Sequence, residues 1–412
     1  MAEGKIIPGV FTLPRLERVI SGPGTIDALP SELDRYDCSR AVIVTGRTVG
    51  SSSLTRRVEE LLGARCAAIF NGARQHVPSN TVDALVRAVR EAGADALISL
   101  GGGSPIDTAK CAVHAFLHPP ADSRELSVGR REPAQCPPHT VIGGRAPDAP
   151  VHIAVPTTLS AGEFTGVAGM TDETTLVKRA LFDTRLAPRT VIADPIVTLD
   201  TPAWLWAASG VRALDHAIET LYAGRRHPIS EPLAERAIRM LVDHLPPSLD
   251  ATDTALLHRG QCQMAAWLAV FGVTNAGFGL SHVLGHQLGP RWNVAHGFTS
   301  AIMLPHAMRV MARMAPSRFQ AIARAYDVPF DAAHPEAAAF ACADRTAAFI
   351  ERLSLPSRLR DVGVPRDGLG LVAAVAASLM ARSENTDGPA ESAGAEQLVS
   401  ARDLEEVLLA AY

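Results

Sequence analysis

The chain has 412 residues, of which 47% are hydrophobic and 20% are charged, and its formal net charge is −4. This length predicts two domains of an ordinary globular protein, and the acidic balance argues against nucleic acid or an anionic membrane as the main partner. The N-terminus lacks a basic region followed by an apolar run, and no apolar run approaches ~20 residues, so we expect neither a signal peptide nor a membrane span.

Strands and helices alternate through the first part of the chain. An edge strand is expected over 15–24, and apolar strands follow at 41–45, 67–70 and 96–100, with helices over 53–62, 80–91 and from the glycines at 101–103 to 117. This alternation predicts a parallel, Rossmann-like sheet with right-handed crossovers. Ligands of such sheets gather at the carboxyl ends of the strands.

The next stretch completes this α/β domain, which we place at residues 1–195. Residues 120–150 are rich in proline, arginine and glycine and have no periodicity, so they predict a long surface excursion. A strand over 151–158 follows, then a hairpin of 164–171 and 174–183, and a last strand over 190–195.

Long helical patterns dominate from about residue 201, which predicts an all-α domain over 196–412. They cover 202–224, 229–245, 252–271, 276–289, 296–314, 316–326, 335–353, 367–382 and 401–411. The polar, small-residue segment 385–395 predicts a mobile loop.

The stretch from Leu100 to Lys110 joins a buried strand, three glycines and the start of a helix. Glycines let the backbone approach an oxygen closely, and the N–H groups of a helix start favour an anion, for which a pyrophosphate is the natural ligand. Asp107 is expected to cap the first helical turn. A tight turn that binds no ligand is the alternative.

Four histidines mark the helical half as the place of chemistry. His282 and His286 lie four residues apart on one helix face, His296 begins the next helix, and His216 lies on an earlier helix. Imidazoles at these spacings can converge on a cleft, where they ligate a metal or relay a proton. Each one alone is more readily explained as a hydrogen-bonded structural residue than as a ligand.

Four motifs give the chain a resemblance to the iron-containing alcohol dehydrogenase family, within the dehydroquinate-synthase-like superfamily. They are Gly101-Gly-Gly-Ser-Pro-Ile-Asp107 with Ala109-Lys110, Val155-Pro-Thr-Thr158, Ala213-Leu-Asp-His216-Ala-Ile-Glu219, and His282-x3-His286-x9-His296-Gly297. The resemblance covers nearly the whole chain. It implies a dinucleotide-binding domain, a helical domain, an active site between them, and a homodimer.

The resemblance also implies roles for single positions. The pyrophosphate loop would comprise Gly101, Gly102, Gly103, Ser104 and Asp107, and Thr157 and Thr158 would line the cofactor. His76 falls near the adenosine half of the cofactor, Lys178 near the nicotinamide ribose, and His286 beside the nicotinamide. The three metal ligands of the family match His216, His282 and His296.

Arg212 is where this chain departs from the family. Members that bind a metal place an aspartate there, four residues before the histidine that matches His216. A guanidinium offers no lone pair and repels a dication, so we expect no metal, with a three-histidine zinc site left open. Arg212 would instead polarise a carbonyl or grip a substrate carboxylate. The alternative is that it turns outward and pairs with Asp215 or Glu219; Asp215 itself is expected to point away from the site.

The maleylacetate reductase branch of the family also lacks the metal aspartate and is similar in residues 161–165, although arginine is not its usual residue at 212. It implies a metal-independent NAD(P)H-dependent reductase of an activated carbonyl, a conjugated keto acid or an enone. Arg212 and His216 would stabilise the charge on oxygen, and His282, His286 or His296 would supply the proton. A metal-dependent alcohol or aldehyde dehydrogenase, or a non-redox lyase or ligand-binding member, is the alternative.

The end of the strand over 41–45 bears on the choice of cofactor. NAD-specific relatives resemble one another in an acid at this place, which binds the ribose 2′-OH, whereas this chain has Gly46 and Arg47. The exchange favours NADP(H), with use of both NADP(H) and NAD(H) as the alternative. The six cysteines are scattered without metal-ligand spacing, which predicts free thiols and a cytoplasmic protein.

Overall fold

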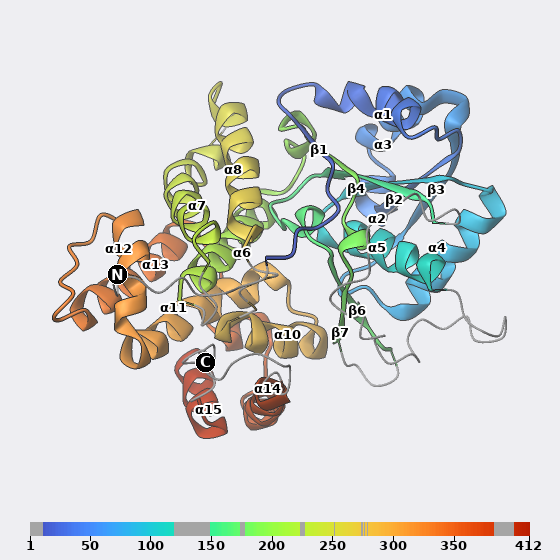
Figure 1. The fold of residues 1–412 in the computed structure, drawn as a ribbon. Coiled ribbons are helices and arrows are strands. Elements are labelled where there is room, and N and C mark those ends of the chain that lie inside the picture. Colours follow the sequence, from blue (N-terminus) through green and yellow to red (C-terminus); the bar gives the residue numbers. More distant parts are fainter. Residues whose placement is uncertain are drawn as a thin grey trace.

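The computed structural model describes residues 11–118, 149–173, 178–222, 227–250, 252–272, 275, 277, 279–382 and 399–412. An α/β domain built on a parallel sheet lies beside a domain of helices (Figure 1). This confirms the predicted fold class. The sheet ends at residue 193 and the first long helix begins at residue 203; the domain boundary at 195/196 stays a prediction.

The sheet has six strands in the order β1-β8-β5-β4-β2-β3, and every pair is parallel. The strand predicted over 15–24 is β1, at one edge. The bounds are β1 (Arg18–Ser21), β2 (Ala41–Gly46), β3 (Cys66–Ala73), β4 (Ala96–Gly101), β5 (Val151–Pro156) and β8 (Thr190–Ala193).

Successive side chains of each strand point to opposite faces of the sheet, and helices cover both faces. Ile43 and Ile98 pack beneath α1 (Leu29–Arg35) and α3 (Ser53–Leu62). Val42 and Leu97 pack on the opposite side beneath α4 (Ser79–Ala92) and α5 (Gly103–Leu117). Two short helices, α1 and α2 (Arg47–Gly50), were not predicted, because one or two turns are too short for the helical period to register.

The predicted hairpin is β6 (Val167–Thr171) paired antiparallel with β7 (Lys178–Phe182). It packs beside α5, where the buried Lys110 ammonium donates to the carbonyls of Gly162 and Val167. The expectation that Asp107 caps α5 is wrong: this residue lies one turn inside the helix, and its Oδ2 accepts from the backbone N–H of Gly169, 3.2 Å away. A cap must precede the first turn, and Gly102 holds that place.

The helical half confirms the predicted helices, with shifted ends. They are α6 (Ala203–Tyr222), α7 (Ser230–His244), α8 (Ala255–Val270), α10 (Leu280–Trp292), α11 (His296–Met314), α12 (Gln320–Ala325), α13 (Glu336–Arg352), α14 (Leu369–Arg382) and α15 (Ala401–Ala410). Helix α10 continues past its expected end through Pro290, and left-handed Asn293 (φ 53°) then ends the helix.

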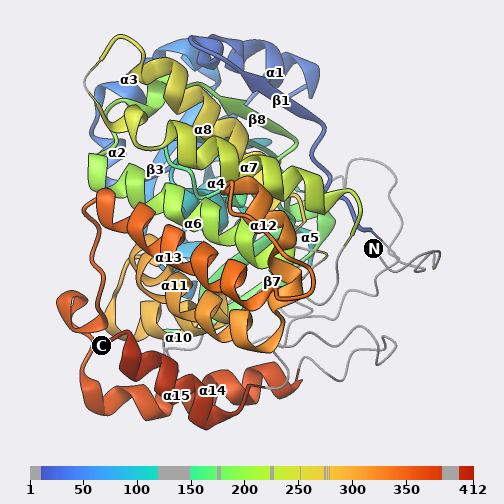
Figure 2. The same cartoon turned by 90° about the vertical axis from the view of Figure 1, so that its left-hand side faces the viewer.

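Helix α6 is buried along nearly its whole length and forms the centre of the helical half. Helices α10 and α11 pack together below it, and α14 and α15 lie at the end of the molecule farthest from the sheet (Figure 2). Polar side chains of α6 that face α10 and α11 are therefore withdrawn from water and need partners there.

Several predictions about segments lie outside the described residues: the excursion over 120–150 except for its last two residues, the loop over 385–395, and Cys136. The five described cysteines are free thiols, as expected. Among the described helices, none has both the length and the apolar character that crossing a membrane requires.

Candidate active site

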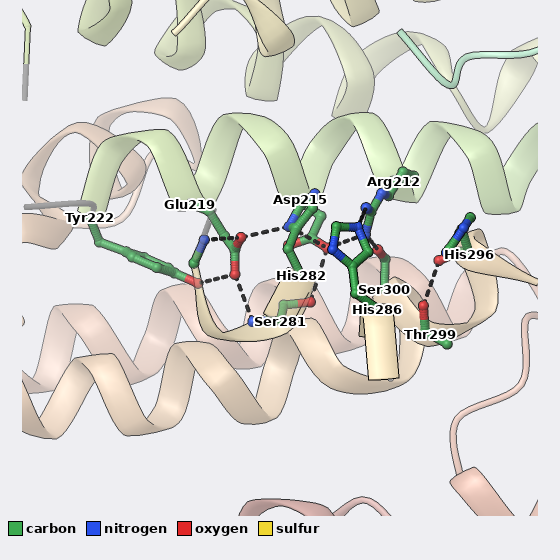
Figure 3. A network of polar contacts seen from close by, with 11 residues as sticks. Arg212, Asp215, Glu219, Tyr222, Ser281, His282, His286, His296, Thr299 and Ser300 are labelled. Atoms are coloured by element: carbon green, nitrogen blue, oxygen red, sulfur yellow. Dashed lines mark hydrogen bonds and ion pairs between the residues drawn. The ribbon is translucent and has the colours of Figure 1, made fainter. Parts of the chain in front are cut away.

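Three helices supply the site: α6, α10 and α11 (Figure 3). On α6, Arg212, Asp215, His216 and Glu219 recur at helical spacing and form one stripe. Helix α10 presents His282 and His286 to this stripe, and α11 begins at His296. The structure thus brings the five predicted catalytic residues together, with His216 and His282 buried and the other three half-buried.

Arg212 turns inward. Its side chain is only 11% exposed, and its guanidinium donates to Ser300 Oγ at 3.0 Å and contacts His286 Nε2 at 3.2 Å. Burial lowers the pKa of Arg212, an effect that the charge of Asp215, 3.8 Å away, opposes. Of the alternative, the outward turn is wrong, since partners on α10 and α11 hold the side chain inside, whereas the ion pair with Asp215 is present.

Glu219 is the best-connected acceptor of the site, although it was not predicted as a site residue. Its carboxylate accepts the backbone N–H groups of Gly279 (2.8 Å) and Ser281 (2.7 Å), and it lies 2.6 Å from His282 Nδ1. A glycine is required at 279, because a Cβ there would lie 2.6 Å from this carboxylate. A side chain of α6 therefore caps α10 and fixes the ring that α10 carries.

Asp215 belongs to the same network, so the expectation that it points elsewhere is wrong. Its Oδ2 accepts from Ser281 Oγ at 2.9 Å and lies 3.4 Å from His282 Nδ1. Residues 212, 215 and 219 share a helix face, and this spacing was the signal that could have revealed both carboxylates.

The two carboxylates control the charge of His282. Burial and the charge of Arg212 act to lower the pKa of His282, but Asp215 and Glu219 outweigh them and leave it raised. His216 stacks on His282 with ring centroids 4.8 Å apart. Burial, reinforced by His282 and Arg212, lowers the pKa of His216 well below its usual value, so His216 is a neutral imidazole at neutral pH.

The remaining histidines extend the site toward the sheet domain. The ring of His286 lies 6.2 Å from that of His282 and 5.9 Å from that of His296, measured between centroids. Each pair meets edge-on. The four rings of residues 216, 282, 286 and 296 thus form a row beside the guanidinium of Arg212.

Two carboxylates and one imidazole form a group of donors close enough together to hold a metal ion. Within the described residues, the group of His, Cys, Asp or Glu donors that lie within 4.8 Å of one another is Asp215, Glu219 and His282, and not the three histidines that match the family's ligands. The oxygens of Glu219 already accept N–H groups, and Nδ1 of His282 faces them. These contacts describe a hydrogen-bond network between the helices.

The glycine stretch turns the chain from the end of β4 into the start of α5. Gly101 adopts φ +141°, Gly102 precedes the first turn of α5, and among the described residues no side chain caps this helix. Thr157 donates its N–H to the carbonyl of Gly101 at 2.9 Å, and Thr158 packs against Gly102. Uncapped N–H groups at the start of a 15-residue helix fit a pyrophosphate.

A second hollow opens at the carboxyl ends of β2 and β3. This cavity of about 830 Å³ is lined by Arg47, Arg74 and Arg87 together with Asn80 and Thr81. Of the described residues that line it, none is acidic. Gly46 ends β2 directly before Arg47.

The resemblance implies cofactor contacts for His76 and Lys178, and His76 is not among the described residues that line this cavity. His76 packs its ring edge-on against His296, with centroids 5.0 Å apart. Lys178 is the first residue of β7, opposite Thr171; its side chain lies outside the described structure.

Two family models match this chain, one over the α/β half and one over the helical half. The family model "Iron-containing alcohol dehydrogenase" matches residues 16–195, and the model of the C-terminal domain of that family matches residues 206–399. The chain belongs to the iron-containing alcohol dehydrogenase family. It is an NAD(P)-dependent oxidoreductase that acts on a small molecule, with the family's α/β and all-α domains.

Maleylacetate reductases are among its relatives. The chain is 31% identical to the maleylacetate reductase of Burkholderia cepacia over 371 residues, 88% of this chain and 89% of the relative. It is 31% identical to maleylacetate reductase 1 of Cupriavidus pinatubonensis over 323 residues, 77% and 81% of the two chains. The crystal structure of maleylacetate reductase from Agrobacterium tumefaciens superimposes with a TM-score of 0.75 at 25% identity, covering 99% of each chain. These relatives confirm the predicted branch.

Proposed function

We propose that this oxidoreductase is a metal-independent NAD(P)H-dependent reductase of an activated carbonyl, a conjugated keto acid or an enone, as the names of its maleylacetate reductase relatives suggest. The observation that carries the proposal is the buried guanidinium of Arg212, held by Ser300 and His286 at the place of the metal-binding aspartate. A guanidinium has no lone pair to give to a metal, and its charge opposes a dication.

The residues of the chain divide the chemistry among them. A nicotinamide cofactor held at the glycine stretch from Gly101 to Ser104 would supply the hydride chemistry of the reaction. Arg212 and neutral His216 stabilise the negative charge that grows on the substrate oxygen, because fixed donors in a buried site are worth more than donors in water. One of His282, His286 or His296 donates the proton that completes the reduction. A substrate carboxylate would also suit the planar fork of Arg212.

Removal of metal tests the proposal. We expect NADPH oxidation with keto-acid or enone substrates to survive exhaustive chelation, since no step uses a metal. Metal analysis of the same preparation should find less than stoichiometric zinc or iron. Activity that vanishes with EDTA and returns with Zn²⁺ or Fe²⁺ would instead support the metal-dependent alcohol dehydrogenase.

We also propose that the cofactor is NADP(H), held at its pyrophosphate by Gly101, Gly102, Gly103 and Ser104 and flanked by Thr157 and Thr158. The three arginines of the cavity beside β2 support this, because a cluster of guanidinium groups is suited to a ribose 2′-phosphate. NAD(H) would offer these arginines no phosphate, and among the described residues only Arg74 of the three has a carboxylate beside it, that of Glu173 at 3.4 Å.

Arg47→Asp is expected to lower the ratio of kcat/KM for NADPH to kcat/KM for NADH by roughly 10- to 100-fold, the range for losing one or two hydrogen bonds to a charged group. Steady-state kinetics with both cofactors measure this ratio. Arg56→Asp, an exposed arginine on α3, serves as the control and should leave the ratio unchanged. An unchanged ratio in Arg47→Asp would refute the role of Arg47.

The remaining expectations, a homodimer and a cytoplasmic location, stay predictions. So do the roles of Lys178 beside the nicotinamide ribose and of His286 beside the nicotinamide.

A further inference from the structure

His76 connects the sheet domain to the catalytic helices. It lies between β3 and α4, yet its ring meets that of His296, at the start of α11, with planes 83° apart. Gly289 of α10 forms another wall, because a Cβ there would lie 3.2 Å from His76 Cε1. The residue is only 8% exposed. Its ring is therefore enclosed by two helices of the other domain.

The backbone that delivers this ring is held in an unusual conformation. His76 and Val77 have φ values of 64° and 51°, a left-handed region that β-branched residues rarely adopt. Thr171 of β6 pins both residues: its Oγ1 donates to the His76 carbonyl at 2.7 Å, and its N–H donates to the Val77 carbonyl at 2.9 Å. Backbone strain that neighbouring contacts maintain is a feature of functional sites.

We propose that His76 is a positioning residue of the reductase site, which holds the ring of His296 in place against His286. Edge-to-face packing fixes the tilt of the His296 ring, whose centroid lies 5.9 Å from that of His286. The pinned backbone keeps His76 from following its partner if the helices shift. The sheet domain thus sets the geometry of a catalytic ring in the helical domain. This inference deepens the proposed function and rests on it for its kinetic test.

Two substitutions separate the ring from its nitrogens. Asparagine tolerates the left-handed backbone but has no ring, whereas phenylalanine keeps a ring of similar shape. We expect His76→Asn to lower kcat for the keto-acid substrate by roughly 10- to 100-fold, the size of effect that a small misplacement of a catalytic group produces. The dissociation constant for NADPH should stay unchanged, the Tm should fall by far less than is needed to unfold the variant at the assay temperature, and His76→Phe should retain most of the wild-type kcat.

Each contrary result overturns the proposal. Wild-type kcat in His76→Asn would show that the ring positions nothing. Equal losses in the Asn and Phe variants would mean that the nitrogens act, not the packing. A fall in Tm that parallels the fall in kcat would mark a residue needed only for stability. Ser354→Gly, which relieves an exposed left-handed residue (φ 55°) remote from the site, is the control and should leave kcat unchanged.

A second readout does not depend on any substrate. In protein labelled with ¹⁵N at histidine, the ring signals of His296 are identified by their loss in His296→Asn. They are expected to shift in His76→Asn and to stay in place in Ser354→Gly. Unshifted signals would refute the contact. If the wild type reduces no carbonyl compound, the proposed function fails, and these signals alone decide whether His76 positions His296.

Discussion

Replacing Arg212 with alanine is expected to lower kcat/KM for a keto-acid substrate by roughly 10²- to 10³-fold, as when one preorganised donor to an oxyanion is removed. The guanidinium is fixed by Ser300 at 3.0 Å and by His286 at 3.2 Å, so it meets the developing charge without having to reorganise. Most of the loss should fall on kcat, because the interaction strengthens as charge grows on oxygen. Steady-state kinetics, with the dissociation constant for NADPH measured in parallel, test this.

Two companions sharpen the Arg212 experiment. Arg212→Lys keeps the charge but loses the planar fork, so we expect an intermediate loss. Arg345→Ala, which removes an exposed arginine that donates to the Tyr326 carbonyl, should leave kcat/KM unchanged. An Arg212→Ala enzyme with wild-type kcat/KM, or one whose whole defect lies in NADPH binding, would contradict the role we assign to Arg212.

A third variant tests whether Arg212 prevents metal binding. Arg212→Asp restores the aspartate that metal-binding relatives carry four residues before the position of His216. It exchanges a cation that repels a dication for a carboxylate that can ligate one. Metal analysis and calorimetric titration with Zn²⁺ should show tighter binding to this variant than to the wild type. Equal binding would mean that Arg212 is not what excludes the metal.

The sheet and the glycine turn at the end of β4 could be predicted from sequence because their signals are local. An apolar run, three glycines and a helical pattern between residues 96 and 117 specify a strand, a turn and a helix N-terminus by themselves. The long helices were equally visible, whereas α1 and α2 are too short to show a period. The prediction that Asp107 caps α5 was wrong because its hydrogen-bond partner, Gly169, lies in the hairpin 62 residues later.

The polar network of the site could be predicted only in part. The four histidines and Arg212 stand out by type and spacing, but the partners of Glu219 lie about 60 residues away on α10. A buried carboxylate can be predicted from sequence only when it is known which face of its helix packs against another helix. The local sequence does not show which helices pack together. His76 is the same case, because its ring contacts a helix start 220 residues later.

Replacing Glu219 with alanine is expected to lower the free energy of unfolding by about 3–5 kcal/mol, the cost of breaking a buried charge network by removing one partner. The variant leaves the N–H groups of Gly279 and Ser281 without their acceptor and His282 without its closest carboxylate. Urea unfolding curves measure this. Glu235→Ala, which removes a half-buried partner of the exposed Arg324 in the same domain, should cost less than about 1 kcal/mol. A loss of similar size in Glu219→Ala would contradict the network.

The cost of losing Glu219 should also depend on pH, with a definite sign. The pKa of His282 is raised in the folded protein above its ordinary value of 6.5, so the stability that its charge contributes is fully present below pH 6.5 and is lost as pH rises through the raised pKa. Glu219→Ala removes one of the two carboxylates that raise this pKa. The difference in unfolding free energy between wild type and variant should therefore be larger at pH 6 than at alkaline pH, where His282 is neutral in both proteins. A difference that grows with pH would show that the Glu219–His282 contact is not an ion pair.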